Sequence, residues 1–260
     1  MENDRNFVES NSLRIYSLPL HPREAHLWYL FPDRLTDPTL LDAYQRLLCA
    51  EERQQYGRFP FEKTRHEYLV TRALVRTTLS RYVGIPPSIW RFDRNSYGKP
   101  TVAYPQETAP LVFSLSKTNG LIICLAALSW DVGVDIEDIG RPGETAEIAD
   151  RFLSPTEVTV LRSLPQHAQR CRFFEYWTLK EAYVKARGMG LSIPLKQFSF
   201  HLDEDRPARI SFDARLKDDS QMWQFAQFRP TSQHVAAAAI RRGLGQNLKI
   251  QIRQTIPLVY

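Results

Sequence analysis

The chain has 260 residues, of which 43% are hydrophobic and 24% charged, a composition typical of a soluble globular protein with one large domain or two smaller ones. Its net charge of +5 favours an acidic partner, such as nucleic acid, an anionic membrane, a polyphosphate or an acidic protein. Residues 1–10 lack the apolar core of a signal peptide, and the longest apolar run, residues 121–128, is too short to span a bilayer. We therefore expect no membrane partner.

The cysteines and histidines limit the redox and metal chemistry that can be expected. Cys49, Cys124 and Cys171 are odd in number and widely spaced, which favours reduced thiols in a cytoplasmic protein. The six histidines are scattered and form no His-Glu-x-x-His motif, so a histidine-bound transition metal is not expected.

The first part of the chain combines candidate strands with helical segments. Residues 13–18 and 25–30 are a candidate strand pair, and residues 35–53 place apolar side chains at helical spacing. Residues 63–83 predict a long helix, because they contain no glycine or proline and the Gly-Ile-Pro-Pro sequence at 84–87 ends them.

This predicted helix carries a stripe of arginines. Arg65, Arg72 and Arg76 lie near one another, on the side opposite the face that we expect to pack on a core. They are either a solvated basic surface or a clamp for phosphate. A basic nucleic-acid-binding module would use this face, although the sequence contains no known nucleic-acid-binding motif.

Two polar turns follow the helix. The Tyr-Gly-Lys-Pro sequence at 97–100 predicts a turn with a lysine at its tip. Residues 111–115 predict a strand that runs into a polar turn at 116–120, and residues 121–128 predict a fully buried strand. The polar turn is either a plain hairpin tip or a loop that holds a phosphate through N–H groups and charge.

Residues 132–137 alternate as a strand does. Val132, Val134 and Ile136 face the core, so that Asp135 and Glu137 point the other way. Two carboxylates at this spacing repel each other unless a cation lies between them, and oxygen ligands on a stiff strand suit a hard ion such as Mg²⁺. The alternative is an exposed strand edge with two solvated acids.

Residues 177–185 predict a helix that gathers charged groups. Trp177, Glu181 and Lys185 share one face, with Lys180 beside them, although Glu181 and Lys185 have the spacing of a simple ion pair. Upstream, Ser154 and Glu157 form a capping box at a helix start, which explains Glu157 without any catalytic role.

The rest of the chain predicts strands, at residues 198–202, 208–212, 222–228, 234–240 and 248–253. Each half of the sequence has a long helix followed by strands, with an apolar strand near its end. This outline suggests a duplication.

Taken together, these segments resemble the surfactin-type 4′-phosphopantetheinyl transferases. The most specific resemblance combines Gly-Val-Asp-Ile-Glu at residues 133–137 with Trp-Thr-Leu-Lys-Glu-Ala-Tyr-Val-Lys at residues 177–185. The other matches follow the order of the family and lie at residues 97–100, 113–118, 151–157, 188–191 and 194–195.

The resemblance implies an α/β (α+β) fold of two similar subdomains related by a pseudo-twofold axis, each with a small sheet packed on a long helix. It also implies that coenzyme A, as co-substrate, and Mg²⁺ are held in the cleft between the subdomains. We expect an N-terminal subdomain at residues 1–128, which binds coenzyme A, and a C-terminal subdomain at residues 129–260, which binds Mg²⁺ and carries the catalytic groups. We also expect a monomer.

The resemblance further implies the site residues, position by position. The Mg²⁺ ligands are Asp135, Glu137 and Glu181. Lys180 and Lys185 lie beside the pyrophosphate. The carrier serine also needs a general base, for which Glu181, directly or through a metal-bound water, and Glu157 are the two candidates, with the capping box making Glu157 the weaker one. The coenzyme A contacts are Arg72, Tyr97, Gly98, Lys99, Pro100, Leu115, Ser116, Lys117, Thr118 and Lys185.

The sequence departs from the family at two places. Lys117 stands where the family has a histidine associated with the 3′-phosphate of coenzyme A, so we expect the site to persist with altered affinity or pH dependence. Glu52 and Gln55 stand where some members carry lysines near coenzyme A.

The implied reaction transfers 4′-phosphopantetheine from coenzyme A to a serine of an acyl- or peptidyl-carrier protein and releases 3′,5′-ADP. The positive net charge suits an acidic carrier protein. Two alternatives remain, a Mg²⁺-dependent nucleotide pyrophosphohydrolase that uses the same acids and the nucleic-acid-binding module.

Overall fold

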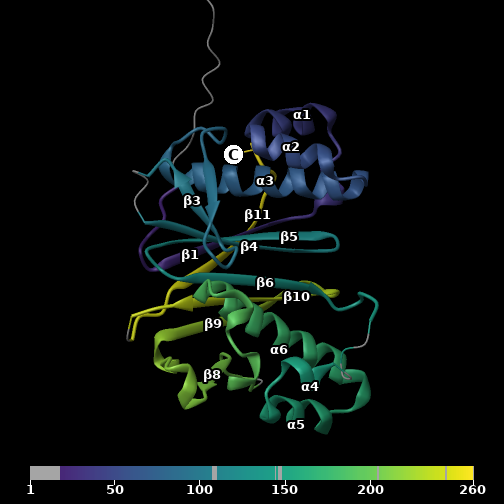
Figure 1. The fold of residues 1–260 in the computed structure, drawn as a ribbon, viewed down its shortest axis with the longest axis vertical. Helices are drawn as coiled ribbons and strands as arrows, with labels where there is room; N and C mark the ends of the chain where they lie inside the picture. Colours follow the sequence, from purple (N-terminus) through teal and green to yellow (C-terminus); the bar gives the residue numbers. More distant parts are fainter. Residues whose placement is uncertain are drawn as a thin grey trace, which may run out of the picture.

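The computed structural model describes residues 18–106, 110–143, 145, 148–203, 205–243 and 245–259. It consists of two halves stacked on each other, with a sheet from each half in the middle and a long helix on each outer side (Figure 1). The candidate strand at residues 13–18 lies outside the described residues, apart from Leu18. No helix in the described ranges is long and apolar enough to cross a membrane.

The first half runs from one strand through three helices to four strands. Its elements are β1 (Glu24–Leu30), α1 (Pro38–Leu47), α2 (Ala50–Arg58), α3 (Glu62–Val83), β2 (Arg91–Arg94), β3 (Pro100–Tyr104), β4 (Leu111–Thr118) and β5 (Leu121–Leu128). The second half repeats this order and adds one strand. Its elements are β6 (Val132–Asp138), α4 (Ala149–Phe152), α5 (Pro155–Ser163), α6 (Gln166–Arg187), β7 (Phe198–His201), β8 (Arg209–Phe212), β9 (Trp223–Thr231), β10 (His234–Arg241) and β11 (Lys249–Gln254).

The two long helices are confirmed and end in the same way. Each has 22 residues, and each stops at a glycine in the left-handed region, Gly84 with φ +65° and Gly188 with φ +63°. A glycine takes this conformation without the steric cost that a Cβ would bring. The single helix expected at residues 35–53 is instead two, α1 and α2, because Leu48 and Cys49 are extended between them.

Alternating side chains explain why the central strands are apolar on both faces. The sheets have the strand orders β11-β1-β5-β4 and β6-β10-β9. From β5, Ile122 and Cys124 join the core under α3, whereas alternate residues join a core cluster shared by both sheets. From β10, Ala237 and Ala239 pack toward α6, and their neighbours enter the same shared cluster. Burial on both sides is what the long apolar runs require.

The element order and strand order confirm the expected pair of similar subdomains. The expected division after residue 128 falls between β5 and β6, but β11 does not follow it. This last strand pairs in parallel with β1 of the first half, from Glu24 opposite Lys249 to Tyr29 opposite Gln254. The sequence pattern predicts that residues 248–253 form a strand, but it does not show which sheet that strand joins, so the pairing of β11 with β1 could not be predicted.

The strand β4 is longer than expected, and this changes where its polar residues point. It runs to Thr118 and leaves only Asn119 and Gly120 for the turn, with Gly120 at φ +76°. Ser116 and Lys117 therefore lie on a strand and face opposite sides of it. The hydroxyls of Ser114 and Thr118 accept hydrogen bonds from the backbone of β6, at 3.1 and 3.2 Å, so β4 lies beside β6.

The strand β6 lies directly on the backbone of α6. A Cβ at Gly133 would stand 1.9 Å from the carbonyl oxygen of Ala182 and 2.4 Å from the nitrogen of Ala186. Only glycine permits this approach. Because side chains alternate along the strand, the same contact turns Asp135 and Glu137 toward α6.

Candidate active site

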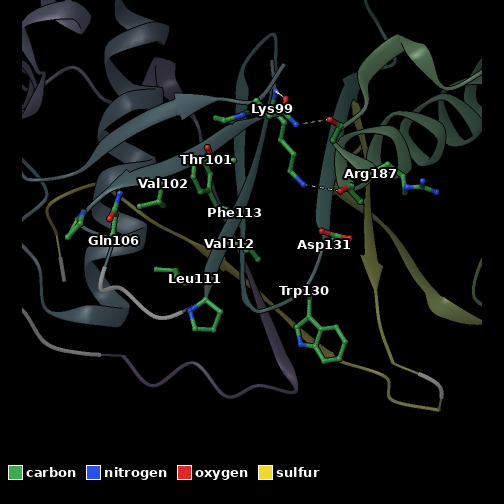
Figure 2. A pocket seen from close by; sticks show the side chains of 16 residues that line it. Lys99, Thr101, Val102, Gln106, Leu111, Val112, Phe113, Trp130, Asp131 and Arg187 are labelled. Atoms are coloured by element: carbon green, nitrogen blue, oxygen red, sulfur yellow. Dashed lines mark hydrogen bonds between the residues drawn. The ribbon is translucent and has the colours of Figure 1, made fainter. Parts of the chain in front are cut away.

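A cavity of about 220 Å³ lies between the two halves. Its walls come from the β2–β3 turn, from β4 and from the last turns of α6, and they include Tyr97, Lys99, Leu115, Glu181 and Lys185. A larger cavity of about 450 Å³ (Figure 2) adjoins it and shares Lys99, Pro100, Phe113 and Gly188 with it, and one of about 580 Å³ lies in the second half. Neither is lined by any of the three acids expected to bind a metal. Its ionisable groups, not its size, make the smaller cavity the candidate site.

Asp135 is the centre of the polar contacts at this site. Its Oδ1 accepts hydrogen bonds from the Ser116 hydroxyl at 2.8 Å and from the Lys185 ammonium at 2.6 Å. Lys185 also lies 2.9 Å from the Ser116 hydroxyl. The other carboxylate oxygen, Oδ2, is buried and has no hydrogen-bond partner among the residues that the structure describes. A buried oxygen in this state calls for a cation or a donor that the protein itself does not supply.

Glu137 is held from two sides. The Trp177 indole donates to its Oε1 at 2.9 Å, and the Arg141 guanidinium lies 3.2 Å from its Oε2. Burial, together with the charge of Asp135, raises the pKa of Glu137 to about 7, against the opposing influence of Arg141. The Trp177 ring stacks on Phe173, which fixes the position of its N–H.

Glu181 is the third acid of the site. Burial raises its pKa, the charge of Asp135 adds to the shift, and Lys185 opposes it. No hydrogen bond from the described residues reaches its carboxylate. Within the described ranges, no three His, Cys, Asp or Glu side chains stand close enough to hold a metal ion as they are. The three acids are nevertheless close enough for the charge of Asp135 to raise the pKa of Glu137 and Glu181, and the Lys185 ammonium binds Asp135.

Two residues expected at the catalytic site lie outside it. Lys180 and Glu157 have fully buried side chains and pair with each other at 2.8 Å in the core of the second half. Lys180 also donates to the carbonyls of Leu195 and Phe198, each at 2.8 Å, and Glu157 Oε1 accepts from the Phe200 N–H at 2.8 Å. The expectation that they contact substrate is therefore wrong. On a helix, the residue before Glu181 points in a different direction, and here that direction is the core.

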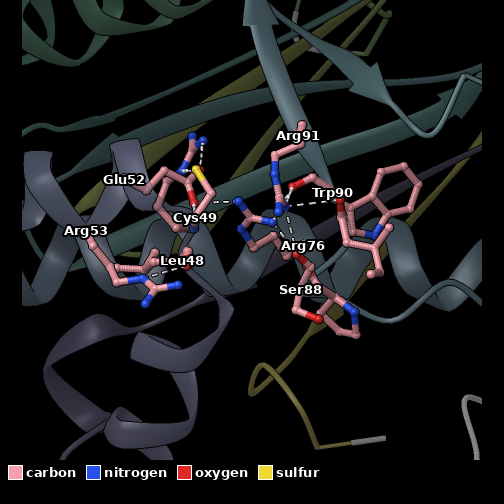
Figure 3. A network of polar contacts seen from close by, with 11 residues as sticks. Leu48, Cys49, Glu52, Arg53, Arg76, Ser88, Trp90 and Arg91 are labelled. Carbon is pink, nitrogen blue, oxygen red and sulfur yellow. Dashed lines mark hydrogen bonds and ion pairs between the residues drawn. The ribbon is translucent and has the colours of Figure 1, made fainter.

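The arginine stripe of the first half is not a basic surface. Arg76 is fully buried, binds Glu52 and donates to the carbonyl of Trp90 at 2.6 Å (Figure 3). Arg72 binds the same carboxylate, with its Nε 2.7 Å from Glu52 Oε1, and Arg65 caps the carbonyl of Phe59 at 2.9 Å. Neither alternative, a solvated basic surface or a phosphate clamp, holds for Arg76. Arg72 lies outside the cavity, and the carboxylate of Glu52 neutralises its charge. Glu52, which stands where some family members carry a lysine, is thus the partner of both arginines.

The expected coenzyme A contacts are only partly brought together. Leu115 and the turn residues Tyr97, Gly98, Lys99 and Pro100 line the cavity with Lys185, and Ser116 reaches Asp135. Thr118 is bonded to β6. Lys117 is exposed, faces away from Asp135 and pairs with Glu67 at 3.0 Å.

Sequence reasoning missed two contacts that shape the site. The first is the hydrogen bond from Ser116 to Asp135, which a turn at 116–120 would not have predicted. The second is Asn95, whose side chain bonds to the backbone of Tyr97, Lys99 and Gly188. An asparagine two residues before a Gly-containing turn was the available signal.

Comparisons with known proteins cover both halves of the chain. The profile of the 4′-phosphopantetheinyl transferase superfamily matches residues 131–239, and that of the 4′-phosphopantetheinyl transferase N-terminal domain matches residues 37–129. The 4′-phosphopantetheinyl transferase HetI of Nostoc is 30% identical over 86% of this chain and 90% of that protein. A 4′-phosphopantetheinyl transferase of Bacillus subtilis is 33% identical over 69% of this chain and 77% of that protein, and the Sfp protein of the same species is 31% identical over 71% and 80%.

Two solved structures show a weaker likeness to parts of the chain. The holo-[acyl-carrier-protein] synthase of Helicobacter pylori, in complex with coenzyme A, has a TM-score of 0.33 and 18% identity over 42% of this chain and 96% of that one. The holo-[acyl-carrier-protein] synthase of Thermotoga maritima has a TM-score of 0.35 and 19% identity over 43% and 62%.

Proposed function

The chain belongs to the 4′-phosphopantetheinyl transferase superfamily, and we propose that the cavity between its halves is where it carries out the transfer. The enzyme moves the 4′-phosphopantetheine group of coenzyme A to a serine hydroxyl of a carrier protein and releases 3′,5′-ADP. The observation that carries the assignment to this cavity is the contact of Asp135 with Lys185, which lines it. The Asp135 carboxylate is hydrogen-bonded to Ser116 and Lys185, and its other oxygen is buried without a hydrogen-bond partner among the described residues.

We propose that this donor set holds Mg²⁺. Asp135, Glu137 and Glu181 offer only oxygen atoms, which a hard divalent ion prefers, and burial, followed by the charge of Asp135, raises the pKa of the other two. When bound, Mg²⁺ would neutralise the charge of the pyrophosphate group whose bond is broken. The unpartnered Oδ2 of Asp135 fits this role, because a cation would satisfy it.

Lys185 and Glu181 have distinct roles in the proposal. The Lys185 ammonium, already at the mouth of the acidic cluster, supplies positive charge to the phosphates, and charge neutralisation accounts for much of the rate in phosphoryl-type transfers. The serine oxygen forms the new bond to phosphorus as the bond to 3′,5′-ADP breaks, and the serine proton goes to Glu181. A buried carboxylate with a raised pKa suits the proton-accepting role.

The proposal also covers the partner and the working form of the enzyme. A chain with net charge +5 attracts an acidic carrier, and we propose that it acts as a monomer without nucleic acid. The nucleic-acid-binding alternative needs an exposed arginine face, whereas Arg76 is buried and paired with Glu52, so a carrier protein is favoured over nucleic acid as the partner.

The test is a transfer assay on the purified protein with coenzyme A, Mg²⁺ and an apo carrier protein, read by the intact mass of the carrier. We expect the carrier to gain the mass of phosphopantetheine, and EDTA to prevent the gain. Glu181→Gln keeps the shape of the side chain and removes its charge, so transfer should fall by about a thousandfold or more with an unchanged circular dichroism spectrum. Near-normal transfer by this variant would refute the roles given to the acids. Release of 3′,5′-ADP without a carrier would instead indicate the pyrophosphohydrolase.

A further inference from the structure

The turn between β2 and β3 is built by one side chain. Asn95 Oδ1 accepts hydrogen bonds from the backbone N–H groups of Tyr97 at 3.0 Å and Lys99 at 2.9 Å. The other end of the same amide, Nδ2, donates to the carbonyl of Gly188 at 2.8 Å. Asn95 therefore shapes a wall of the cavity and also fastens that wall to the end of α6 in the other half.

Lys99 makes the second attachment at this point. Its ammonium donates to the carbonyl of Ala186 at 2.9 Å (Figure 2). It also lies 3.4 Å from the carbonyl of Val132. The last carbonyls of a helix have no partner within the helix and carry partial negative charge, so an ammonium group is favoured there. The lysine expected to contact substrate is thus occupied by the backbone of the catalytic half.

The fit at this attachment is close. A Cβ at Gly188 would stand 2.9 Å from Lys99 Cδ and 3.2 Å from Asn95 Nδ2. The glycine that ends α6 therefore also leaves room for the turn to dock. The docked turn lies one turn of helix beyond Lys185, which itself binds Asp135.

We infer that Asn95, assisted by Lys99, is a positioning residue that sets the donor-binding wall against the reacting groups on α6. The inference rests on the proposed function, in that it assumes the donor occupies the cavity lined by this turn. If the attachment is lost, the wall is in place for only part of the time. The apparent affinity for the donor then falls in proportion to the fraction of time that the wall is in place, whereas the affinity for the carrier and the rate of the chemical step change less.

The deciding variant is Asn95→Asp. Aspartate keeps an oxygen for the two N–H groups of the turn, but replaces the donor to Gly188 with a carboxylate oxygen at the negative end of α6. The matched control is Ser96→Asp, which adds the same charge to the neighbouring exposed position of the turn. Lys99→Met is the second variant, because it removes the other attachment and keeps much of the side-chain length.

We expect Asn95→Asp and Lys99→Met to raise the KM for coenzyme A about three- to tenfold, the size expected for one hydrogen bond. The KM for the carrier and kcat should stay within about twofold, and Ser96→Asp should resemble the wild type. Isothermal titration of each variant with coenzyme A should show the same loss of affinity. Equal behaviour of Asn95→Asp and Ser96→Asp would overturn the inference, as would equal losses toward both substrates accompanied by a fall in Tm.

The two failures can be told apart. Wild-type protein that binds coenzyme A but transfers nothing would refute the proposed function, and the titrations would still decide whether Asn95 sets donor affinity. Wild-type protein that binds no coenzyme A would refute both.

Discussion

The two halves of the molecule share a buried ion pair in the same place. Arg76 on α3 and Lys180 on α6 stand the same number of residues before the terminal glycines of their helices. Each pairs with a glutamate at the third position of a short preceding helix, Glu52 in α2 and Glu157 in α5. In both halves the cation also donates to a backbone carbonyl at the start of the next strand, that of Trp90 just before β2 and that of Phe198 at the start of β7. These charges belong to the scaffold.

The halves differ on the strand face that meets the long helix. In the first half, β1 places Trp28 and Leu30 in the core under α3. In the second half, the corresponding face of β6 carries Asp135 and Glu137 against α6. The cations near the helix ends differ too. Arg81 binds Thr255 and Val259 of the C-terminal segment, whereas Lys185 binds Asp135. The same framework thus holds a packed core in one half and the proposed active site in the other.

The largest effect that tests this comparison comes from the buried pairs. Lys180→Met leaves the buried carboxylate of Glu157 without its cation, which should cost about 3–5 kcal/mol of unfolding free energy. Arg76→Met should cost less, because Arg72 still binds Glu52. Urea denaturation would measure it. Adding Glu157→Gln to Lys180→Met should recover part of the loss.

The same variants separate scaffold from chemistry. Lys180→Met should retain wild-type transfer per folded molecule, because its side chain does not reach the cavity. A fall of a hundredfold or more in folded Lys180→Met protein, measured well below its unfolding midpoint, would contradict the comparison.

A smaller effect is expected at Trp177, whose place on α6 corresponds to Ala73 on α3. Trp177→Phe keeps an aromatic ring against Phe173 and removes the hydrogen bond to Glu137. Losing an outer contact to a metal ligand weakens metal binding by about 10- to 100-fold, so the Mg²⁺ concentration for half-maximal transfer should rise by that factor. Trp130→Phe is the control, since its indole binds the distant carbonyl of Pro22. An unchanged Mg²⁺ requirement in Trp177→Phe would argue against Glu137 as a ligand.

The smallest effect concerns a strand-to-helix ion pair present in both halves. Lys117 on β4 pairs with Glu67 on α3, and Arg229 on β9 pairs with Glu175 on α6 at 2.9 Å. Ion pairs at the protein surface contribute about 0–1 kcal/mol each, so Glu67→Gln should lower stability by no more than that, and Glu175→Gln, which also loses its pair with Arg172, by somewhat more. Because Glu67→Gln frees the charge of Lys117, it should lower the KM for coenzyme A about two- to threefold at low salt. A matching change in Glu175→Gln would show a general charge effect instead.

Local pattern was sufficient for much of the secondary structure and for the shared strand face of Asp135 and Glu137. A long run without glycine or proline, ended by Gly84, predicted α3, and the capping box at Ser154 and Glu157 predicted the start of α5. Strand alternation predicted that Asp135 and Glu137 share a face. These features depend on residues close in the chain, so the sequence contains the information directly.

Only the tertiary structure decided which charged side chains are buried in ion pairs and which line the cavity. Lys180 and Glu181 are neighbours in sequence, yet one is fully buried with Glu157 and the other lines the cavity. The same holds for Arg76, bound by a glutamate from another helix, and for β11, which pairs with β1. Burial and pairing are set by segments far apart in the chain, and a charged side chain's role follows from its partners rather than from its type.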